Sequence, residues 1–242
     1  MLDILYEDKN MIACVKSCGI SSQRDEKSGH DMLTVLDGYF KENNDNSTAY
    51  PVHRLDSAVG GVMVYAKNKA FAARLSELIA KTSGDEQKMR GEECFTKEYL
   101  AVIHGVPKEK SGMLCDLLYH DKRRNKTFVV DRERKGVKKA LLYYETLGTQ
   151  GDTSLVHVRL ITGRTHQIRV QFASRKMPLV GDGRYGARDN VKEMGLWSYK
   201  ITLTLRGQKR QEFSKLPQGE IWSQFAQAEI FSGKIVDKAE KV

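Results

Sequence analysis

The stretch PVHRLDSAVGGVMVYAKN, residues 51–68, places a polar motif directly in front of an apolar segment. His53, Arg54 and Asp56 supply a base, a cation and a carboxylate, and two glycines separate them from VMVYAK. A short apolar run rich in valine predicts a buried strand. We therefore expect three side chains suited to chemistry at the mouth of a core strand.

The segments on either side of this stretch predict more strands than helices. Strands are expected over ILYED, MIACVK, FTKEYLAVIHG, TFVV, ALLYYETL, SLVHVRLIT and WSYKITLTLR, and helices over 31–42 and after Asn68. The strict alternation at 197–206 is typical of an antiparallel strand with one buried face. Because strands seldom alternate with helices, the pattern favours an α+β fold built on a large mixed, mostly antiparallel sheet with flanking helices and loops. The charged segment 81–93 is expected to be a loop, and its composition fits either a solvated segment or one that binds a partner.

The composition is that of a basic protein. The chain has 40 Lys and Arg against 31 Asp and Glu, a formal charge of +9, which suits a polyanionic partner. No apolar run approaches membrane-spanning length, and acidic residues near the start argue against a secretory signal. The four cysteines form no C-x-x-C pair and have no histidine at metal-binding spacing. We expect a soluble cytoplasmic protein without a metal.

A second polar motif, TGRTHQIRVQFA, occupies residues 162–173. Gly163 is expected to permit a sharp turn, and Thr165 to be the N-cap of a helix on which His166 and Arg169 share a face. An arginine on the first turns of a helix is suited to hold a carboxylate bidentately and to keep it ionised. Each of these features, taken alone, also fits an ordinary structural role, because short motifs match by chance.

Taken together, the motifs resemble the pseudouridine synthases of the RluA type. The matching segments are HRLDSAVGGVMVYAK, KEYLAVIHG, TGRTHQIR, GDGRYG at 181–186 and the N-terminal hairpin, in the family's order from about residue 2 to about 206. The sequence departs from the family at Val59 and Gly60, where Thr-Ser is usual, and at Ser17, where Pro usually follows the lysine. The segment 81–93 is also longer than is typical. These departures affect none of the residues to which chemistry is assigned.

The resemblance implies an isomerase that converts uridine in RNA to pseudouridine and needs no cofactor. It makes Asp56 the nucleophile, leaves open whether C1′ or C6 is attacked, and makes Tyr99 the residue that stacks on the base and assists proton removal. Arg169 would pair with Asp56. Contacts to the substrate RNA and base flipping fall to His53, Arg54, Arg164 and His166, with Arg54 filling the gap that the extruded base leaves.

The segment 120–139 is the most basic part of the chain, with nine Lys and Arg against three Asp and Glu. It fits either a solvated hairpin or an arm that contacts phosphates. Under the second interpretation, RNA backbone contacts are assigned to Lys122, Arg123, Arg124 and Lys126. The partner would be ribosomal or transfer RNA.

We expect a single catalytic domain over residues 1–242, without a preceding S4-type RNA-binding domain and with a loose tail at 232–242. A monomer without an obligatory protein partner or a membrane is expected. One alternative is a catalytically silent RNA-binding module with the same fold. Another is a hydrolase that uses Asp56, but it lacks the second well-placed carboxylate that glycoside hydrolysis normally needs.

Overall fold

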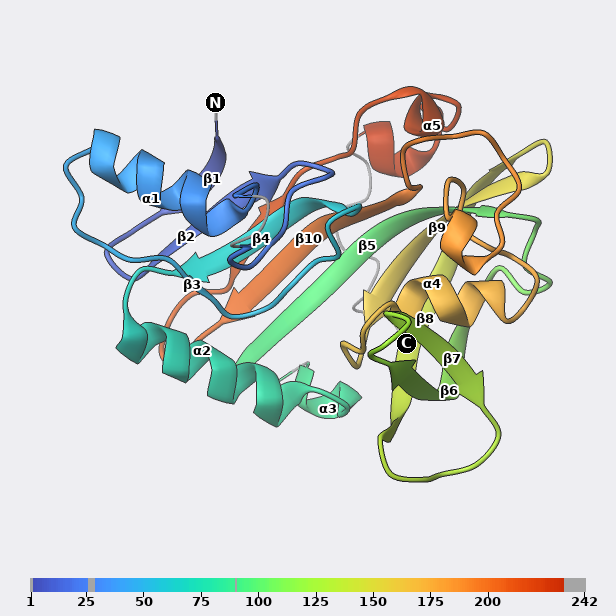
Figure 1. The fold of residues 1–242 in the computed structure, drawn as a ribbon, viewed down its shortest axis with the longest axis horizontal. Coiled ribbons are helices and arrows are strands. Elements are labelled where there is room, and N and C mark those ends of the chain that lie inside the picture. Colours follow the sequence, from blue (N-terminus) through green and yellow to red (C-terminus); the bar gives the residue numbers. More distant parts are fainter. Residues whose placement is uncertain (1, 26–28, 90, 233–242) are drawn as a thin grey trace. The chain divides into compact units, whose positions relative to one another are not determined.

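The computed structural model describes residues 2–25, 29–89 and 91–232, which form two compact units (Figure 1). Within the described residues, the first unit is made of Met1–Tyr99, Leu160–Gly163 and Trp197–Lys215, and the second of Leu100–Arg159, Arg164–Leu196 and Leu216–Val242. The single domain expected over 1–242 stays a prediction. The tail expected at 232–242 lies, beyond residue 232, outside the described residues.

The first unit contains a sheet in which β1, β2, β4 and β10 are neighbours in that order. Its strands are β1 (Asp3–Glu7), β2 (Met11–Lys16), β3 (Tyr50–Pro51), β4 (Gly60–Ala66), β10 (Leu196–Thr204) and β11 (Gln211–Ser214). β1–β2, β2–β4, β3–β4 and β10–β11 are antiparallel, whereas β4 and β10 are parallel. The N-terminal hairpin expected over ILYED and MIACVK is thus confirmed.

The prediction for β10 is only partly right. The strand is antiparallel to β11 but parallel to β4. Ser198 and Thr202, expected on an exposed polar face, are both buried. The hydroxyl of Ser198 donates to the carbonyl oxygen of Val62 at 2.9 Å, so this polar group is satisfied inside the sheet.

Two helices of the first unit begin where the sequence predicts. At the start of α1 (Met32–Glu42) the carboxylate of Asp31 accepts a hydrogen bond from the Thr34 amide, and at the start of α2 (Lys69–Thr82) the side chain of Asn68 accepts one from the Phe71 amide. The segment 81–93 also contains a helical turn, α3 (Glu86–Met89), which the sequence reasoning missed. The carboxylate of Asp85 accepts from the next turn's backbone and caps it.

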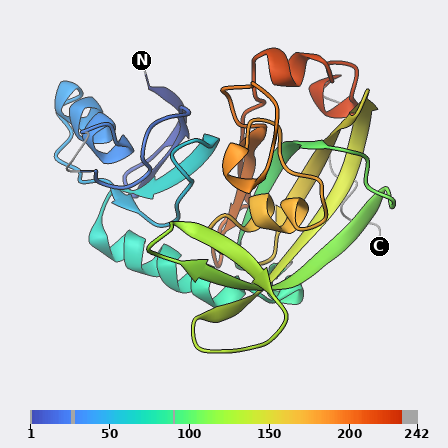
Figure 2. The same cartoon turned by 45° about the vertical axis from the view of Figure 1, so that its right-hand side comes forward.

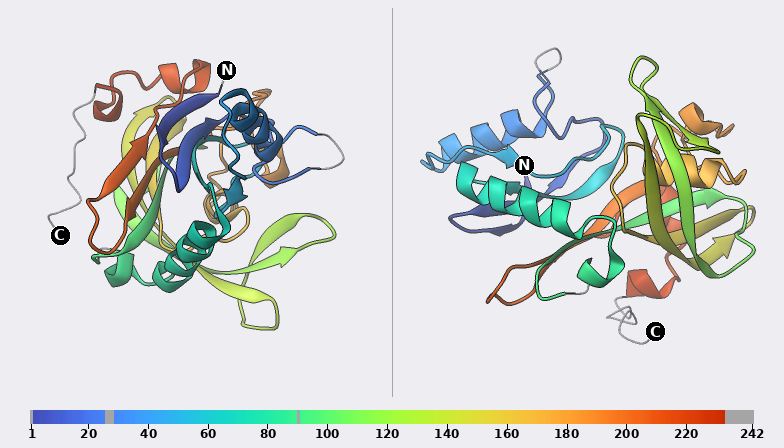
Figure 3. Two further views of the ribbon diagram at one scale, coloured as in Figure 1. Left: turned by 90° about the vertical axis from the view of Figure 1, so that its left-hand side faces the viewer. Right: turned by 90° about the horizontal axis from the view of Figure 1, so that it is seen from below.

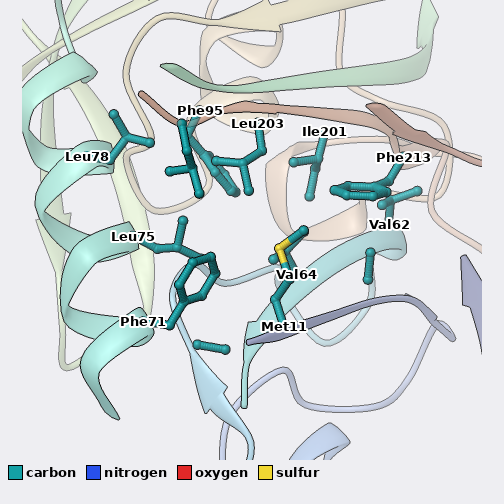
Figure 4. Packing of buried hydrophobic residues seen from close by; sticks show 13 residues of the cluster. Met11, Val62, Val64, Phe71, Leu75, Leu78, Phe95, Ile201, Leu203 and Phe213 are labelled. Atoms are coloured by element: carbon teal, nitrogen blue, oxygen red, sulfur yellow. The ribbon is translucent and has the colours of Figure 1, made fainter. Parts of the chain in front are cut away.

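The core of the first unit lies between α2 and the sheet, as Figure 4 shows. α2 contacts β4 of this sheet, and Figure 3 shows the helix in teal from two further sides. Phe71, Leu75 and Leu78 of α2 are buried in one cluster with Val64 of β4 and Ile201 of β10. The apolar stripe of this helix is therefore a core face, as its spacing predicts.

The second unit contains long antiparallel strands and several short helices. Its elements are β6 (Ser111–Asp121), β7 (Lys126–Val130), β8 (Val137–Gln150), β9 (Thr153–Leu160, the last residue belonging to the first unit), α4 (Gln167–Ala173), η1 (Gly183–Tyr185), α5 (Glu220–Ser223) and η2 (Glu229–Ser232). β6 pairs with β7 and with β8, and the hairpin of β6 and β7 can be followed in yellow-green in Figure 2. The sequence reasoning did not assign β6. Its alternation is weak because Gly112 and Asp116 interrupt the apolar positions.

One strand, β5 (Cys94–His104), passes from the first unit into the second between Tyr99 and Leu100. The predicted α+β class, with a mixed and mostly antiparallel set of strands, is confirmed. None of the helices in the described ranges combines the length and apolar character that spanning a bilayer requires.

Candidate active site

The HRLD loop of the first unit is anchored through its leucine. The Ser22 hydroxyl donates to the carbonyl oxygen of Leu55 at 2.9 Å and accepts from its amide at 3.2 Å. Leu55 is buried, whereas Arg54 is exposed and Asp56 is partly exposed. The loop therefore fixes the backbone at Leu55 and leaves the cation and the carboxylate on either side of it accessible.

A buried lysine supports the turn that follows Asp56. The ammonium group of Lys16 donates to the carbonyl oxygens of Ser17, Ile20 and Ser57 at 2.9, 2.7 and 3.1 Å. Burial lowers the pKa of Lys16 to about 8, although the charges of Cys18 and Asp56 act to raise it. The sequence reasoning did not single out this residue as functional. The sequence feature that could have identified it is its position: Lys16 ends the apolar strand MIACVK, which belongs to the N-terminal hairpin that resembles the family.

His53 fastens the loop to the neighbouring strand. Its Nε2 accepts from the amide of Val64 at 3.0 Å, and its ring lies 5.4 Å from that of Phe95, centroid to centroid. Burial, and then the charge of Lys97, lower the pKa of His53 to about 3. The imidazole is therefore neutral and holds the loop, and its expected role toward RNA stays a prediction.

Asp56 and Tyr99 are brought together within the first unit. Tyr99, on β5, is 5% exposed, and its pKa is raised by burial and by the negative charge of Asp56. A hydrogen bond with the hydroxyl of Ser198 acts in the opposite direction. The phenol consequently stays protonated at neutral pH. Ser198 was missed because it alternates with apolar residues in what reads as an exposed polar face.

The TGR turn reaches the first unit at Gly163, where it contacts β5. A Cβ atom at Gly163 would lie 2.9 Å from the ammonium nitrogen of Lys97. Gly163 is not among the residues with positive φ, so the structure does not show the left-handed turn for which a glycine would be required, and a larger side chain here would displace only the end of the Lys97 side chain. Burial lowers the pKa of Lys97 to about 8. Lys97 is thus a second lysine, besides Lys16, whose pKa is lowered by burial, and it lies two residues before Tyr99 on β5.

In the second unit, the helix after the TGR turn begins later than predicted. Thr165 is not its N-cap, because His166 takes that position in the left-handed conformation, with φ 54° and ψ 24°, and makes no capping hydrogen bond. The carbonyl oxygen of Thr165 instead accepts from the hydroxyl of Thr127 at 2.9 Å. The chain is tied to β7 at this point, which leaves the helix to start at Gln167.

Arg169 is held bidentately by a carboxylate of its own unit. Its Nε and Nη2 donate to the two carboxylate oxygens of Asp182 at 2.7 and 2.8 Å, and both side chains are buried. The guanidinium carbon lies 5.0 Å from the centroid of the Tyr185 ring. Asp182 and Tyr185 belong to GDGRYG, a motif that the sequence shows but that had been given no role. The expected pairing of Arg169 with Asp56 stays a prediction.

His166 and Arg164 of the TGRTHQIR motif are also held by hydrogen bonds within the second unit. His166 is buried and its Nδ1 lies 2.9 Å from the hydroxyl oxygen of Tyr185, which accepts from the Thr127 amide at 2.8 Å. The Nε of Arg164 donates to the carbonyl oxygen of Lys139 at 3.0 Å. These contacts join the start of α4 to the basic hairpin, and the expected contacts of His166 and Arg164 with RNA stay predictions.

The four basic residues assigned to the RNA backbone differ in their surroundings. Lys122, Arg123 and Arg124 are exposed on the turn between β6 and β7, where the carboxylate of Asp121 accepts from the amides of Arg123 and Arg124. Lys126 is partly buried, with its ammonium nitrogen 5.3 Å from the centroid of the Tyr185 ring. In the described part of the chain no group of three or more His, Cys, Asp or Glu is placed to hold a metal ion.

Comparison with known proteins gives consistent results. The sequence model of the family described as RNA pseudouridylate synthase matches residues 10–174. A Bacillus subtilis protein named as an uncharacterized RNA pseudouridine synthase, YlyB, is 31% identical over 197 residues, which cover 78% of this chain and 59% of that protein. The Borreliella burgdorferi ribosomal large subunit pseudouridine synthase D is 31% identical over 225 residues, covering 89% of this chain and 65% of that one. The chain thus spans about three fifths of the length of these relatives.

Among solved structures, the human RNA pseudouridylate synthase domain containing 4 superposes with a TM-score of 0.71 at 21% identity. The match covers 93% of this chain and 92% of that one. At this level of identity the likeness concerns the fold.

Proposed function

The chain belongs to the RluA-type RNA pseudouridylate synthase family, and we propose that it isomerises specific uridines in structured RNA to pseudouridine. The observation that carries the proposal is the placement of the Asp56 carboxylate in the HRLD loop close enough to raise the pKa of the buried Tyr99. The relatives named as ribosomal large subunit synthases make ribosomal RNA the first substrate to test, with transfer RNA the second. We propose that it acts in the cytoplasm as a monomer.

In the proposed reaction, Asp56 is the nucleophile. A uridine in folded RNA hides its glycosidic bond, so the base must leave its stack before the carboxylate reaches it. Attack at C1′ or at C6 leads to cleavage of the bond between N1 and C1′, rotation of the uracil and formation of a bond between C5 and C1′. The covalent bond to Asp56 is broken in this sequence, the C5 proton then leaves, and N1 takes up a proton, so nothing is oxidised or reduced. A single nucleophile is sufficient for this sequence.

Tyr99 has a restricted part in this scheme. Its pKa is raised by burial and by Asp56, so the phenolate is disfavoured and the residue meets the substrate as a neutral phenol. A neutral phenol stacks on the base and donates a hydrogen bond, but it is a poor acceptor for the C5 proton. Once the carboxylate of Asp56 is released from its covalent bond, it is the better acceptor in the same unit.

Arg169 is proposed to stabilise the ionised form of Asp56. A guanidinium has five N–H groups, and the bidentate pair with Asp182 engages Nε and Nη2. Asp182 and Tyr185 fix the plane of the guanidinium before substrate binds, which avoids the entropy cost of ordering a long side chain. Arg54, exposed beside the nucleophile, is proposed to fill the place of the extruded base, since a planar guanidinium both stacks and donates hydrogen bonds.

The test is release of tritium from RNA labelled at C5 of uridine. Wild-type protein is expected to release tritium to water without cutting the RNA, and Asp56→Asn to release none while RNA binding persists. Asp37→Asn, which neutralises an exposed carboxylate of the same unit, is the control and should match wild type. Free uracil or RNA fragments would indicate a hydrolase, and binding without tritium release by wild type would indicate a silent module.

A further inference from the structure

A groove in the second unit is lined by none of the proposed catalytic residues Asp56, Tyr99 and Arg169. Its volume is about 490 Å³, and it is lined by residues of β7, α4 and the turn at 183–186. Its described lining includes two cations, Lys126 and Arg184, and no Asp or Glu. This volume is typical of sites that hold a small molecule or one residue of a polymer. The charge of the lining favours an anion.

Two aromatic rings form part of this groove. Phe128 and Tyr185 are both partly exposed, and the ammonium nitrogen of Lys126 lies 5.9 Å from the centroid of the first ring and 5.3 Å from that of the second. A flat face beside a cation is what single-stranded nucleic acid uses, because each base has a π face and each nucleotide a phosphate. The same arrangement offers little to a neutral ligand.

The ring of Tyr185 is fixed in advance. Its hydroxyl oxygen is held by the Thr127 amide and by His166, at 2.8 and 2.9 Å. The hydroxyls of Thr127 and Ser174, which also line the groove, donate to carbonyl oxygens of the protein. Polar groups that are already engaged do not read base edges. The groove is therefore built for stacking that tolerates any base.

The glycine at the start of the turn leaves the groove open. A Cβ atom at Gly183 would meet no other atom within 4 Å, and its φ is not in the left-handed region. A larger side chain at this position would extend into open space without straining the backbone. Gly183 is thus a position in the lining of the groove where a larger side chain is accommodated without changing a contact that holds the fold.

We propose that this groove binds one single-stranded nucleotide of the RNA substrate, with its base stacked against Phe128 and its phosphate beside Lys126 and Arg184. The inference rests on the proposed function, since it places part of the RNA on the same chain. The guanidinium of Arg184 donates to the carbonyl oxygen of Asn125 at 2.9 Å, which ties the groove to the turn that carries Lys122, Arg123 and Arg124. Those cations would contact the phosphates that follow.

The test is the dissociation constant of the full chain for short single-stranded oligouridine and oligocytidine, measured by fluorescence anisotropy. Phe128→Ala and Gly183→Leu are each expected to weaken the binding of both oligonucleotides by roughly tenfold, the loss of one stacked base. Phe128→Tyr should retain wild-type affinity. Gly38→Leu is the matched control, because Gly38 is an exposed glycine of α1 whose Cβ would also meet nothing within 4 Å.

Unchanged affinity of Gly183→Leu and of folded Phe128→Ala would overturn the proposal, as would an effect confined to one of the two sequences. A polyglutamate peptide bound with the same dependence on Phe128 would assign the groove to acidic proteins instead. Gly183→Leu keeps the test decisive if Phe128→Ala fails to fold. Tritium release by wild-type protein reports separately on the proposed function, so a groove that binds RNA without turnover would contradict only that function.

Discussion

The guanidinium of Arg169 and the carboxylate of Asp182 form a bidentate pair that is buried on both sides, with side chains 6% and 1% exposed. Such a pair is strongly coupled, because removing one partner leaves an uncompensated charge in a medium of low dielectric. The GDGRYG turn therefore holds Arg169, the arginine of the TGRTHQIR motif, through the carboxylate of Asp182.

Asp182→Asn should destabilise the protein by about 3–5 kcal/mol, because it removes the buried carboxylate charge that the Arg169 guanidinium engages bidentately. Urea unfolding measures the loss. The double variant Arg169→Met with Asp182→Leu should recover much of that stability, since it removes both charges, yet it should lack activity. Asp131→Asn, at an exposed surface pair, is the control and should unfold like wild type. A double variant less stable than Asp182→Asn would contradict this account.

Tyr99→Phe should lower the turnover rate by roughly 10²-fold or less, since the ring still stacks and only the hydroxyl is lost. Tyr99→Ala should reduce it much further. Because the pKa of Tyr99 is raised, the ultraviolet titration of wild type and Tyr99→Phe should coincide up to pH about 10, where ordinary tyrosines begin to ionise. A tyrosine that titrates below that pH in wild type and is absent from the variant would contradict the neutral phenol.

Lys16 gives a dependence of stability on pH whose sign follows from its pKa. The folded value is about 8 and the ordinary value is 10.5, so between them the unfolded chain binds more protons than the folded one. The free energy of unfolding should therefore rise with pH in that window as the cost of a buried ammonium is relieved. The comparison is with Lys16→Met, which removes the ammonium group that donates to the carbonyl oxygens of Ser17, Ile20 and Ser57. The stability difference between wild type and Lys16→Met should grow between these two pH values, and a constant or falling difference would refute it.

Neutralising Lys122, Arg123 and Arg124 to glutamine should weaken RNA binding and flatten its salt dependence. For every phosphate that the variant no longer neutralises, the slope of log K against log salt should become shallower by about 0.7–0.9. Changing the exposed Lys41, Lys192 and Lys209 alters the net charge equally and is the control. If the slopes of log K against log salt are equal in the two triple variants, the turn between β6 and β7 is a solvated segment that does not contact phosphates.

Gly61→Ala should be strongly destabilising. Gly61 has φ 121°, and a Cβ there would lie 2.3 Å from the backbone oxygen of Ser198 on β10. The clash is with backbone, which cannot move without breaking the parallel pairing of β4 and β10. Thermal unfolding should show a large decrease in melting temperature, whereas Gly38→Ala in α1 should raise it slightly. A Gly61→Ala protein as stable as wild type would contradict the close packing of these strands.

Local patterns were sufficient to predict α1, α2, the N-terminal hairpin and the α+β class. Asp31 and Asn68 are polar residues directly before apolar helical stripes, and such a signal depends only on nearby residues. The two glycines that separate HRLD from VMVYAK in the sequence begin β4 in the structure. They are required there by the close approach of β10, which lies far along the chain. A pattern within one segment carries no information on a neighbour that distant in sequence.

The same limit applies to the site. Asp56, Tyr99 and Arg169 stand in recognisable motifs, whereas the support that Asp182 gives to Arg169 and Lys16 gives to the Ser57 carbonyl depends on long-range contacts. Thr165 was a reasonable N-cap by residue type. It is not the cap in the structure because its carbonyl accepts from Thr127, a residue of another strand.

The chain passes between its two units five times, after Tyr99, Arg159, Gly163, Leu196 and Lys215. Neither unit is a continuous segment, so no single truncation of the gene yields one of them intact. Asp56 of HRLD belongs to the first unit and Arg169 of TGRTHQIR to the second, and the segments of the two units alternate along the chain. A recombination that exchanged one unit for a homologous one would therefore need several simultaneous breakpoints. The two halves are therefore expected to be inherited and to evolve as one block.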